Sequence, residues 1–366
     1  MNPNALAPRA GLRDVTPYVS PQVEARARLN TNECPVDLPA AFHEDLAAAV
    51  GALPLNRYPD GEMTELRTAL AERHDHPVDG VWTANGSNEI LTQLLQAYGG
   101  HGRQAIIFEP TYLLHSRLCW LTQTRPIQLR LKPPFIIGAH DVTAAGSMHP
   151  NIIFVCSPNN PTGNMQPLTD IEHLVKAAPQ ALVVVDEAYV DFGGETALGL
   201  VAEYPNLAVV RTFSKAFSMA GARIGYVLTS PDVVGDLRRV RLPYNLSVLT
   251  QTAGVVALRH MDSALGLLDG IRAQRDRIFA ALEAIEGCTV FPSRANFVLF
   301  IPPKPAVGVW QGLLDRGVLV RDMSAAVPGA LRVTAGTADE VDLFLAALTE
   351  VLATEPTPAP TPGEAG

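Results

Sequence analysis

The stretch LAVVRTFSKAFSMAGAR, residues 207–223, joins an apolar run to a segment rich in small, hydroxyl-bearing and cationic residues. The apolar run is typical of a buried strand, and the change after it indicates a loop that carries chemistry. Lys215 lies in this loop between Phe213 and Phe217. Partial burial would lower the pKa of its amine, and a neutral amine can attack an aldehyde. The alternative is a lysine at a helix start whose amine extends to water.

Lysine is rare in this chain, which makes its presence in this loop informative. Only four of the 28 lysines and arginines are lysine, namely Lys132, Lys176, Lys215 and Lys304. Lys132 and Lys304 are each followed by proline in expected loops, and Lys176 lies on the polar face of an expected helix. Lys215 is therefore the lysine placed for nucleophilic or proton-transfer chemistry.

The composition is that of a globular protein, with 47% hydrophobic and 18% charged residues in a chain of 366. A formal net charge of −9 without a cluster of Lys and Arg argues against a nucleic-acid partner and favours a small-molecule substrate. The four cysteines show neither disulfide nor metal-ligand spacing, so we expect no metal and a cytoplasmic location. No run reaches the roughly 18 apolar residues of a membrane span, and no export signal is recognised, so no membrane partner is expected.

Strand-like apolar runs alternate with helical patterns over much of the chain. The runs are residues 81–84, 105–108, 127–131, 152–155, 181–185, 207–210 and 224–228. This alternation predicts an α/β domain with a mostly parallel sheet flanked by helices. Ligands bind at the carboxyl ends of the strands in such sheets, so the loops that follow the strands form the candidate site.

Changes in pattern predict four segments. Residues 1–38 form an N-terminal arm, because prolines interrupt any periodicity there. Residues 39–245 form the large α/β domain, and residues 246–353 form a smaller α+β domain that begins with a long helical region and is completed by part of the arm. Residues 354–366, rich in Pro, Ala and Gly, form a disordered tail.

Two segments near the start of the large domain carry further candidate residues. NGSNE, residues 85–89, follows a strand and opens a helix, so its backbone amides could face an anion. An ordinary helix cap is the alternative. The segment lacks the GxGxxG and GxxxxGK[ST] patterns, which argues against a dinucleotide fold or a P-loop. LNRYPDG, residues 55–61, is a turn that carries Tyr58, whose alternative role is to cover apolar surface.

Two later strands end in polar residues. SPNNPTG, residues 157–163, follows one strand, and its prolines and glycine make a rigid turn that can hold an Asn side chain at the sheet edge. The next strand ends in Asp186. A carboxylate that leaves a core is costly unless it is paired, so Asp186 needs a positive partner or serves as a helix N-cap.

These segments, in this order, resemble the fold-type I pyridoxal-phosphate-dependent aminotransferases, and among them most closely the histidinol-phosphate aminotransferase family. The resemblance covers nearly the whole chain. It rests on RYPD (57–60), SPNNPTG (157–163), VVDEAY (184–189), TFSKAF (212–217) and ARIGY (222–226). The chain departs from the family at NECP (32–35), where Asn-Glu-Asn-Pro is usual, and this departure concerns the arm.

The resemblance implies pyridoxal 5′-phosphate as the cofactor. Lys215 would bind its aldehyde covalently and later move protons, and Asp186 would pair with the ring nitrogen. Asn160 and Tyr189 would hydrogen-bond the phenolic oxygen, and Tyr112 would stack on the ring. The phosphate would be held by the amides of Gly86, Ser87 and Asn88, the hydroxyls of Thr212 and Ser214, Arg223 and, from the neighbouring subunit of a homodimer, Tyr58.

The resemblance also implies a reaction in histidine biosynthesis, in which imidazole acetol phosphate and glutamate give histidinol phosphate and 2-oxoglutarate. Arg332 occupies the family's carboxylate-binding position. Arg321 and Tyr18 would add contacts suited to a phosphate, unless Arg321 pairs with an acid such as Asp322. The alternatives within the fold are an aromatic amino-acid aminotransferase and a phosphothreonine-type decarboxylase. A cofactor-binding protein that regulates rather than catalyses is a further alternative. The set Asp186, Lys215, Arg223 and Arg332 disfavours it, because a regulator does not need a lysine that carries protons.

Overall fold

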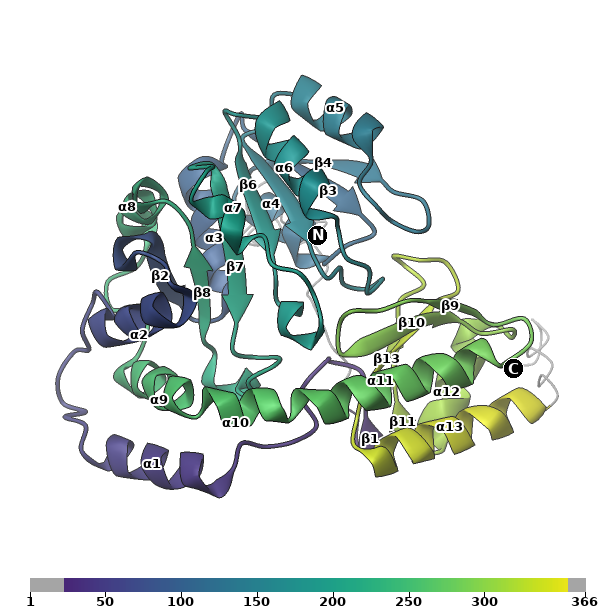
Figure 1. Ribbon diagram of the computed structural model, residues 1–366. Coiled ribbons are helices and arrows are strands. Elements are labelled where there is room, and N and C mark those ends of the chain that lie inside the picture. The colour runs from purple at the N-terminus through teal and green to yellow at the C-terminus, as the bar shows by residue number, and fades with distance from the viewer. Residues whose placement is uncertain (1–22, 355–366) are drawn as a thin grey trace, which may run out of the picture.

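The computed structural model describes residues 23–354, and Figure 1 shows a large α/β part beside a smaller part with its own sheet. The first 22 residues of the predicted arm, with Tyr18, and the predicted tail from residue 355 lie outside the described residues.

The large part is built on a seven-stranded sheet. Its order is β2 (Val81–Ala84), β8 (Gly225–Leu228), β7 (Leu207–Thr212), β6 (Leu182–Asp186), β5 (Ile152–Cys156), β3 (Gln104–Glu109) and β4 (Arg125–Arg130). Strand β8 runs antiparallel to both of its neighbours, and all other pairs are parallel. The predicted mostly parallel sheet is confirmed, and each strand lies within two residues of its predicted run.

Helices cover both faces of this sheet. They are α2 (Thr64–His74), α3 (Ser87–Tyr98), α4 (Leu114–Leu121), α5 (Ala139–Ser147), α6 (Leu168–Ala177), α7 (Leu198–Val201) and α8 (Pro231–Val240). Side chains alternate across a strand, and on β6 Val184 joins one apolar cluster while Val183 and Val185 join another. Burial on both faces explains why these strands read as unbroken apolar runs.

The smaller part contains a four-stranded antiparallel sheet. Its order is β12 (Arg321–Asp322), β13 (Leu331–Thr334), β10 (Phe297–Ile301) and β9 (Thr289–Phe291), with helices α12 (Ala306–Asp315) and α13 (Ala338–Ala353). The arm reaches this part, because β1 (Ala27–Arg28) pairs in parallel with β11 (Val318–Leu319). Residues 318–322 are thus divided between two pairings, since β11 pairs with the arm and β12 pairs with β13.

Helices connect the two parts. Figure 1 shows α9 (Val248–Arg259), α10 (Met261–Gly266) and α11 (Leu268–Glu283) in a row below the large sheet, with α11 reaching the smaller sheet. The expected long helical region is therefore three helices. Helix α1 (Ala40–Gly51) packs on α9 at the far end of the row.

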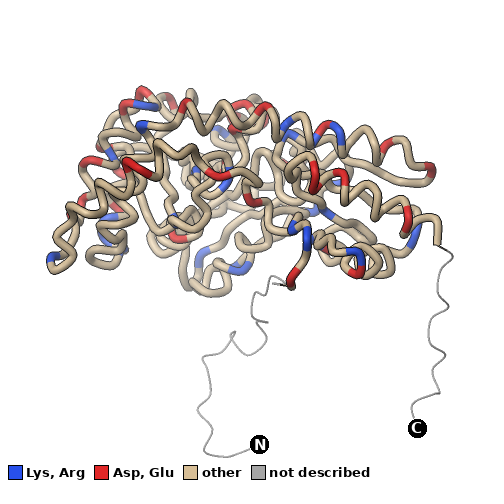
Figure 2. Tube along the Cα trace, turned by 90° about the horizontal axis from the view of Figure 1, so that it is seen from below, with Lys and Arg blue, Asp and Glu red and all other residues tan. Residues whose placement is uncertain are grey.

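Between residues 23 and 354 no helix combines the length and apolarity that crossing a bilayer requires. Figure 2 shows lysines and arginines interspersed with aspartates and glutamates along the described trace.

Candidate active site

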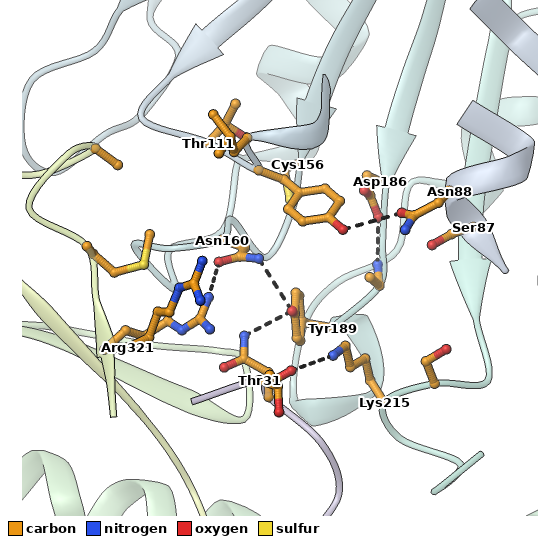
Figure 3. A pocket seen from close by; sticks show the side chains of 18 of the residues that line it. Thr31, Ser87, Asn88, Thr111, Cys156, Asn160, Asp186, Tyr189, Lys215 and Arg321 are labelled. Atoms are coloured by element: carbon orange, nitrogen blue, oxygen red, sulfur yellow. Dashed lines mark hydrogen bonds between the residues drawn. The ribbon is translucent and has the colours of Figure 1, made fainter. Parts of the chain in front are cut away.

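A pocket of about 440 Å³ lies at the carboxyl ends of the central strands and faces the smaller sheet (Figure 3). Twelve of the predicted site residues line it, namely Ser87, Asn88, Tyr112, Asn160, Asp186, Tyr189, Thr212, Ser214, Lys215, Arg223, Arg321 and Arg332. Segments from both parts and from the arm therefore meet at one cavity.

Lys215 follows β7 and extends into this pocket. Its Nζ donates a hydrogen bond to the backbone oxygen of Thr31 at 3.0 Å (Figure 3). Burial is the main cause that lowers the pKa of Lys215 to about 8; the charges of Arg332 and Arg223 contribute to this shift, and Glu33 opposes it. The neutral amine is thus accessible near physiological pH, which suits a nucleophile or proton carrier.

Asp186 ends β6 and is buried at the floor of the pocket. Its Oδ1 accepts the backbone N–H of Ala188 at 3.1 Å, and its Oδ2 lies 3.2 Å from Nε2 of His115. The His115 ring is fully buried and stacks on Phe154, with centroids 4.9 Å apart. His115 on α4 was missed at the sequence level, although it lies three residues after Tyr112 at the start of a helix. It holds the carboxylate in place while Asp186 still lines the cavity.

The loops that carry Asp186 and Lys215 are tied together by a buried ion pair. Glu187 directly follows Asp186, and Arg211 directly precedes Thr212. Arg211 Nη2 lies 2.8 Å from Glu187 Oε2, and both side chains are almost fully buried. The Glu187 N–H also donates to the Val210 oxygen at 2.9 Å. Removing either charge would leave the other buried without its partner, so this pair fixes the relative position of β6 and β7.

An anion cradle lies at the start of α3. A Cβ on Gly225 would lie 2.1 Å from the Ser87 nitrogen, and one on Gly86 would lie 2.6 Å from Arg223 Nη2. Only glycine therefore lets β8 and Arg223 approach the helix N-terminus this closely. Arg223 Nη1 donates to Ser214 Oγ at 3.2 Å. Backbone amides, hydroxyls and a guanidinium at a helix N-terminus form a donor set suited to a phosphate group.

Two aromatic side chains border the space between Lys215 and the cradle. The Tyr112 hydroxyl donates to Asn88 Oδ1 at 3.3 Å (Figure 3). The Tyr189 hydroxyl accepts hydrogen bonds from Asn32 at 3.0 Å and from Asn160 at 3.5 Å. Burial raises the pKa of Tyr189 to about 12, so this phenol is protonated at neutral pH. Asn32 was not predicted as a site residue.

Arg332 and Arg321 close the side of the pocket formed by the smaller sheet. Arg332 is buried on β13 and donates from Nη1 to Asn160 Oδ1 and from Nη2 to the Asn30 oxygen at 2.8 Å. Arg321 on β12 is its direct cross-strand partner. Asp322, the acid considered for Arg321, accepts the N–H of Ser324 at 2.8 Å. Two guanidiniums at one edge of the pocket suit an anionic substrate group.

Two predicted residues do not line this pocket. Tyr58 is 81% exposed and stacks on Tyr244, with centroids 4.6 Å apart. Within its own chain it therefore lies against Tyr244 rather than in the pocket. Gly86 does not line the pocket, but its lack of a side chain leaves room for Arg223 beside it. Over residues 23–354, no group of three or more His, Cys, Asp and Glu side chains is arranged to hold a metal ion.

Comparison with known proteins places this geometry in context. The family model "Aminotransferase class I and II" matches residues 27–348. Histidinol-phosphate aminotransferase of Mycolicibacterium smegmatis is 45% identical over 365 residues, covering 97% of this chain and 96% of the relative. The enzyme of that name from Thermobifida fusca is 47% identical over 350 residues, covering 93% and 94%.

A solved structure supports the fold. Histidinol-phosphate aminotransferase from Sinorhizobium meliloti, in complex with pyridoxal-5′-phosphate, superposes with a TM-score of 0.83 at 23% identity. The match covers 95% of this chain and 98% of that one. The predicted fold class is thereby confirmed.

Proposed function

Since this chain belongs to the histidinol-phosphate aminotransferases, within the class I and II aminotransferase family, we propose that it transfers an amino group from glutamate to imidazole acetol phosphate. The products are 2-oxoglutarate and histidinol phosphate, in histidine biosynthesis. The observation that carries this proposal is a single pocket that joins a low-pKa lysine, a buried carboxylate, an anion cradle and two arginines.

Pyridoxal 5′-phosphate is the cofactor, and when bound it supplies an aldehyde and an electron-withdrawing ring that stabilises negative charge at the substrate α-carbon. The donor set of the pocket fits this molecule. Asp186 would pair with the ring nitrogen, Asn160 and Tyr189 would hydrogen-bond the phenolic oxygen, and Tyr112 would stack on the ring. The phosphate takes the cradle of Gly86, Ser87, Asn88, Thr212, Ser214 and Arg223.

Lys215 has two roles in this proposal. Its neutral amine is the group that the cofactor aldehyde can join. With the cofactor bound, the same Nζ would act as the base that takes the proton from the substrate α-carbon and then as the acid that returns it, because a pKa of about 8 lies close to neutral pH. Lys215 is the lysine that lines the pocket within the described chain.

Arg332 and Arg321 bind the anionic group of the substrate. Arg332 holds the α-carboxylate of glutamate, and the two guanidiniums together hold the phosphate that takes this place in histidinol phosphate. Asn160, held by Arg332, links the substrate end of the pocket to Tyr189. Tyr18, which lies outside the described residues, is proposed as a further substrate-binding residue.

We infer a homodimer with shared sites, in which Tyr58 reaches the cofactor phosphate of the neighbouring subunit. Large apolar side chains near Tyr58 in sequence or in space are also exposed, namely Leu55, Leu242 and Tyr244. Leu55 is 66% exposed and Leu242 is 74% exposed. Exposed apolar side chains of this size support burial against a second copy of the chain.

The compartment and the segment boundaries are further proposals. Cytoplasmic location is supported by Cys34, Cys119, Cys156 and Cys288, which are all free thiols. We propose boundaries at residues 1–38 for the arm, 39–245 for the large domain, 246–353 for the small domain and 354–366 for the tail. Limited proteolysis would test these boundaries.

Single-turnover absorbance of the cofactor tests the reaction, because each half-reaction changes its spectrum. Histidinol phosphate and glutamate should each react, and histidinol phosphate should react faster than phenylalanine or histidinol by roughly tenfold or more, the effect of one charge-assisted contact. Equal rates with phenylalanine would favour an aromatic amino-acid aminotransferase. Release of carbon dioxide from phosphothreonine would favour a decarboxylase.

A further inference from the structure

We propose that Asn32, oriented by Thr334, sets the direction of the Tyr189 hydroxyl hydrogen and makes this hydroxyl a donor toward the pocket. The inference rests on the proposed function, because the group that receives this hydrogen is the phenolic oxygen of the cofactor. Asn32 and Thr334 are positioning residues in this proposal, since they act through Tyr189.

The orientation of Asn32 follows from its bonds to Thr334. The backbone N–H of Asn32 donates to Thr334 Oγ1 at 3.1 Å. The Thr334 hydroxyl then donates its own hydrogen to Asn32 Oδ1 at 3.0 Å. The amide oxygen of Asn32 is thereby occupied, and its Nδ2 lies on the side of the Tyr189 hydroxyl, 3.0 Å away. Asn32 and Thr334 are both almost fully buried, so water does not replace these bonds.

The reversed amide would be less favourable. It would place Nδ2 against Thr334 Oγ1, which already accepts the backbone N–H of Asn32. The Thr334 hydrogen would then lose Asn32 Oδ1 as its acceptor, at a residue that is only 2% exposed. An unpaired buried hydroxyl is costly, so the hydroxyl of Thr334 selects one orientation of Asn32.

Asn160 provides a second donor on the other side of Tyr189. Arginine has no acceptor, so the bond from Arg332 Nη1 must be made to Asn160 Oδ1. The Nδ2 of Asn160 then faces the Tyr189 hydroxyl at 3.5 Å. Figure 3 shows the Asn160 amide directed at the Tyr189 oxygen, which also accepts the bond from Asn32. An oxygen that accepts two hydrogen bonds has only its own hydrogen to donate, and this hydrogen is left for the cavity that Tyr189 lines.

Residues 29–32 of the arm are held by further hydrogen bonds. The Thr334 N–H donates to the Leu29 oxygen at 2.9 Å, and Asn296 Nδ2 donates to the Asn32 oxygen at 3.2 Å. Asn32 itself has a φ of 55°, a left-handed conformation that asparagine adopts more readily than most residues. Hydrogen bonds therefore hold residues 29–32 against β13, the strand that also carries Arg332.

The test is the pKa of the chromophore formed by the cofactor on Lys215, read from absorbance against pH. A hydrogen bond donated to the phenolic oxygen favours its anionic form, so losing this bond should raise the pKa. Thr334→Val keeps the shape but removes the hydroxyl, and we expect it to raise the pKa by about one unit, a tenfold change in the equilibrium. Thr334→Ser keeps the hydroxyl and should leave the pKa unchanged. Asn32→Asp, which can only accept, should raise it as well.

A double-mutant cycle with Tyr189→Phe separates this effect from general disruption. In the Tyr189→Phe background the shift caused by Thr334→Val should disappear. An unchanged pKa in Thr334→Val, or the same shift with and without the tyrosine hydroxyl, would overturn the inference while the enzyme remained an aminotransferase. A wild-type protein that forms no absorbing adduct at Lys215 would instead overturn the proposed function. Thermal unfolding of the Thr334→Val and Thr334→Ser variants shows whether each is folded.

Discussion

Arg321 and Arg332 are directly opposed on the antiparallel strands β12 and β13, and both line the pocket. Directly opposed residues project from the same face of a sheet, and like charges in this position repel each other. An anion between them would relieve that repulsion. We therefore expect this pairing to suit a substrate group with more than one negative charge, such as a phosphate monoester.

Substitution of Arg321 should discriminate between the two substrates. Loss of one charge-assisted contact costs roughly 1.5–3 kcal/mol, on the order of tenfold to a hundredfold in rate. We expect Arg321→Leu to lower kcat/KM for histidinol phosphate by this factor and to affect glutamate less, because its α-carboxylate uses Arg332. Arg332→Leu is the matched variant and should impair both. A histidinol-phosphate reaction unchanged by Arg321→Leu would rule out the two-arginine site.

His115 should support cofactor binding through Asp186. His115→Phe fills the buried site but removes the hydrogen-bond partner of the carboxylate, so we expect cofactor binding to weaken by on the order of tenfold. His115→Gln can still donate and should bind more tightly than His115→Phe. Titration of the apoprotein with cofactor, followed by fluorescence, measures both dissociation constants. Equal dissociation constants for the wild type and His115→Phe would show that the histidine serves only packing.

The sequence predicts those parts of the site that follow long buried strands. Asp186 ends β6 and Lys215 comes three residues after β7, so an apolar run followed by a polar residue is enough to mark both as candidates. The same runs identify the seven strands of the large sheet, because burial on both faces leaves a continuous apolar signal.

Contacts between distant segments could not be predicted in this way. His115 meets Asp186 across 71 positions, and Asn32 meets Thr334 across 302 positions. No local pattern encodes such pairs. The two-residue strands β1 and β12 were also beyond a periodicity argument, since two residues cannot show alternation. Each of these strands is defined only by its pairing with a neighbouring strand in the folded chain.

The pKa of Lys215 predicts how the apoprotein depends on pH. Its folded pKa of about 8 lies below the ordinary lysine value of 10.5, so the unfolded chain binds more protons between these values. The contribution of Lys215 to stability is therefore unfavourable below pH 8 and improves as pH rises from about 8 to 10.5. Unfolding of the wild type and Lys215→Met in denaturant, across this range, should converge at high pH. A constant difference in free energy would contradict the shift.

The same pKa predicts the pH dependence of cofactor attachment. The rate at which the apoprotein reacts covalently with pyridoxal phosphate should rise with pH with a midpoint near 8. Arg332→Leu should move this midpoint upward, because the charge of Arg332 lowers the lysine pKa. Borohydride reduction and peptide mapping identify the modified residue. A label on Lys132, Lys176 or Lys304 instead of Lys215 would refute the assignment.

Tyr58 should act across a dimer interface. Its ring is 81% exposed in the single chain and is held by stacking on Tyr244 rather than by the cradle. If Tyr58 serves the neighbouring subunit, mixing Tyr58→Phe subunits with inactive Lys215→Ala subunits creates heterodimers in which one site has both native residues. Activity should then exceed that of either variant alone. A separate variant, Tyr244→Ala, should weaken cofactor binding, because Tyr58 loses the ring on which it stacks. If Tyr58 serves its own subunit, every Lys215-bearing site in the mixture lacks the native tyrosine. Mixtures whose activity equals the average of the separate variants would therefore disprove sharing.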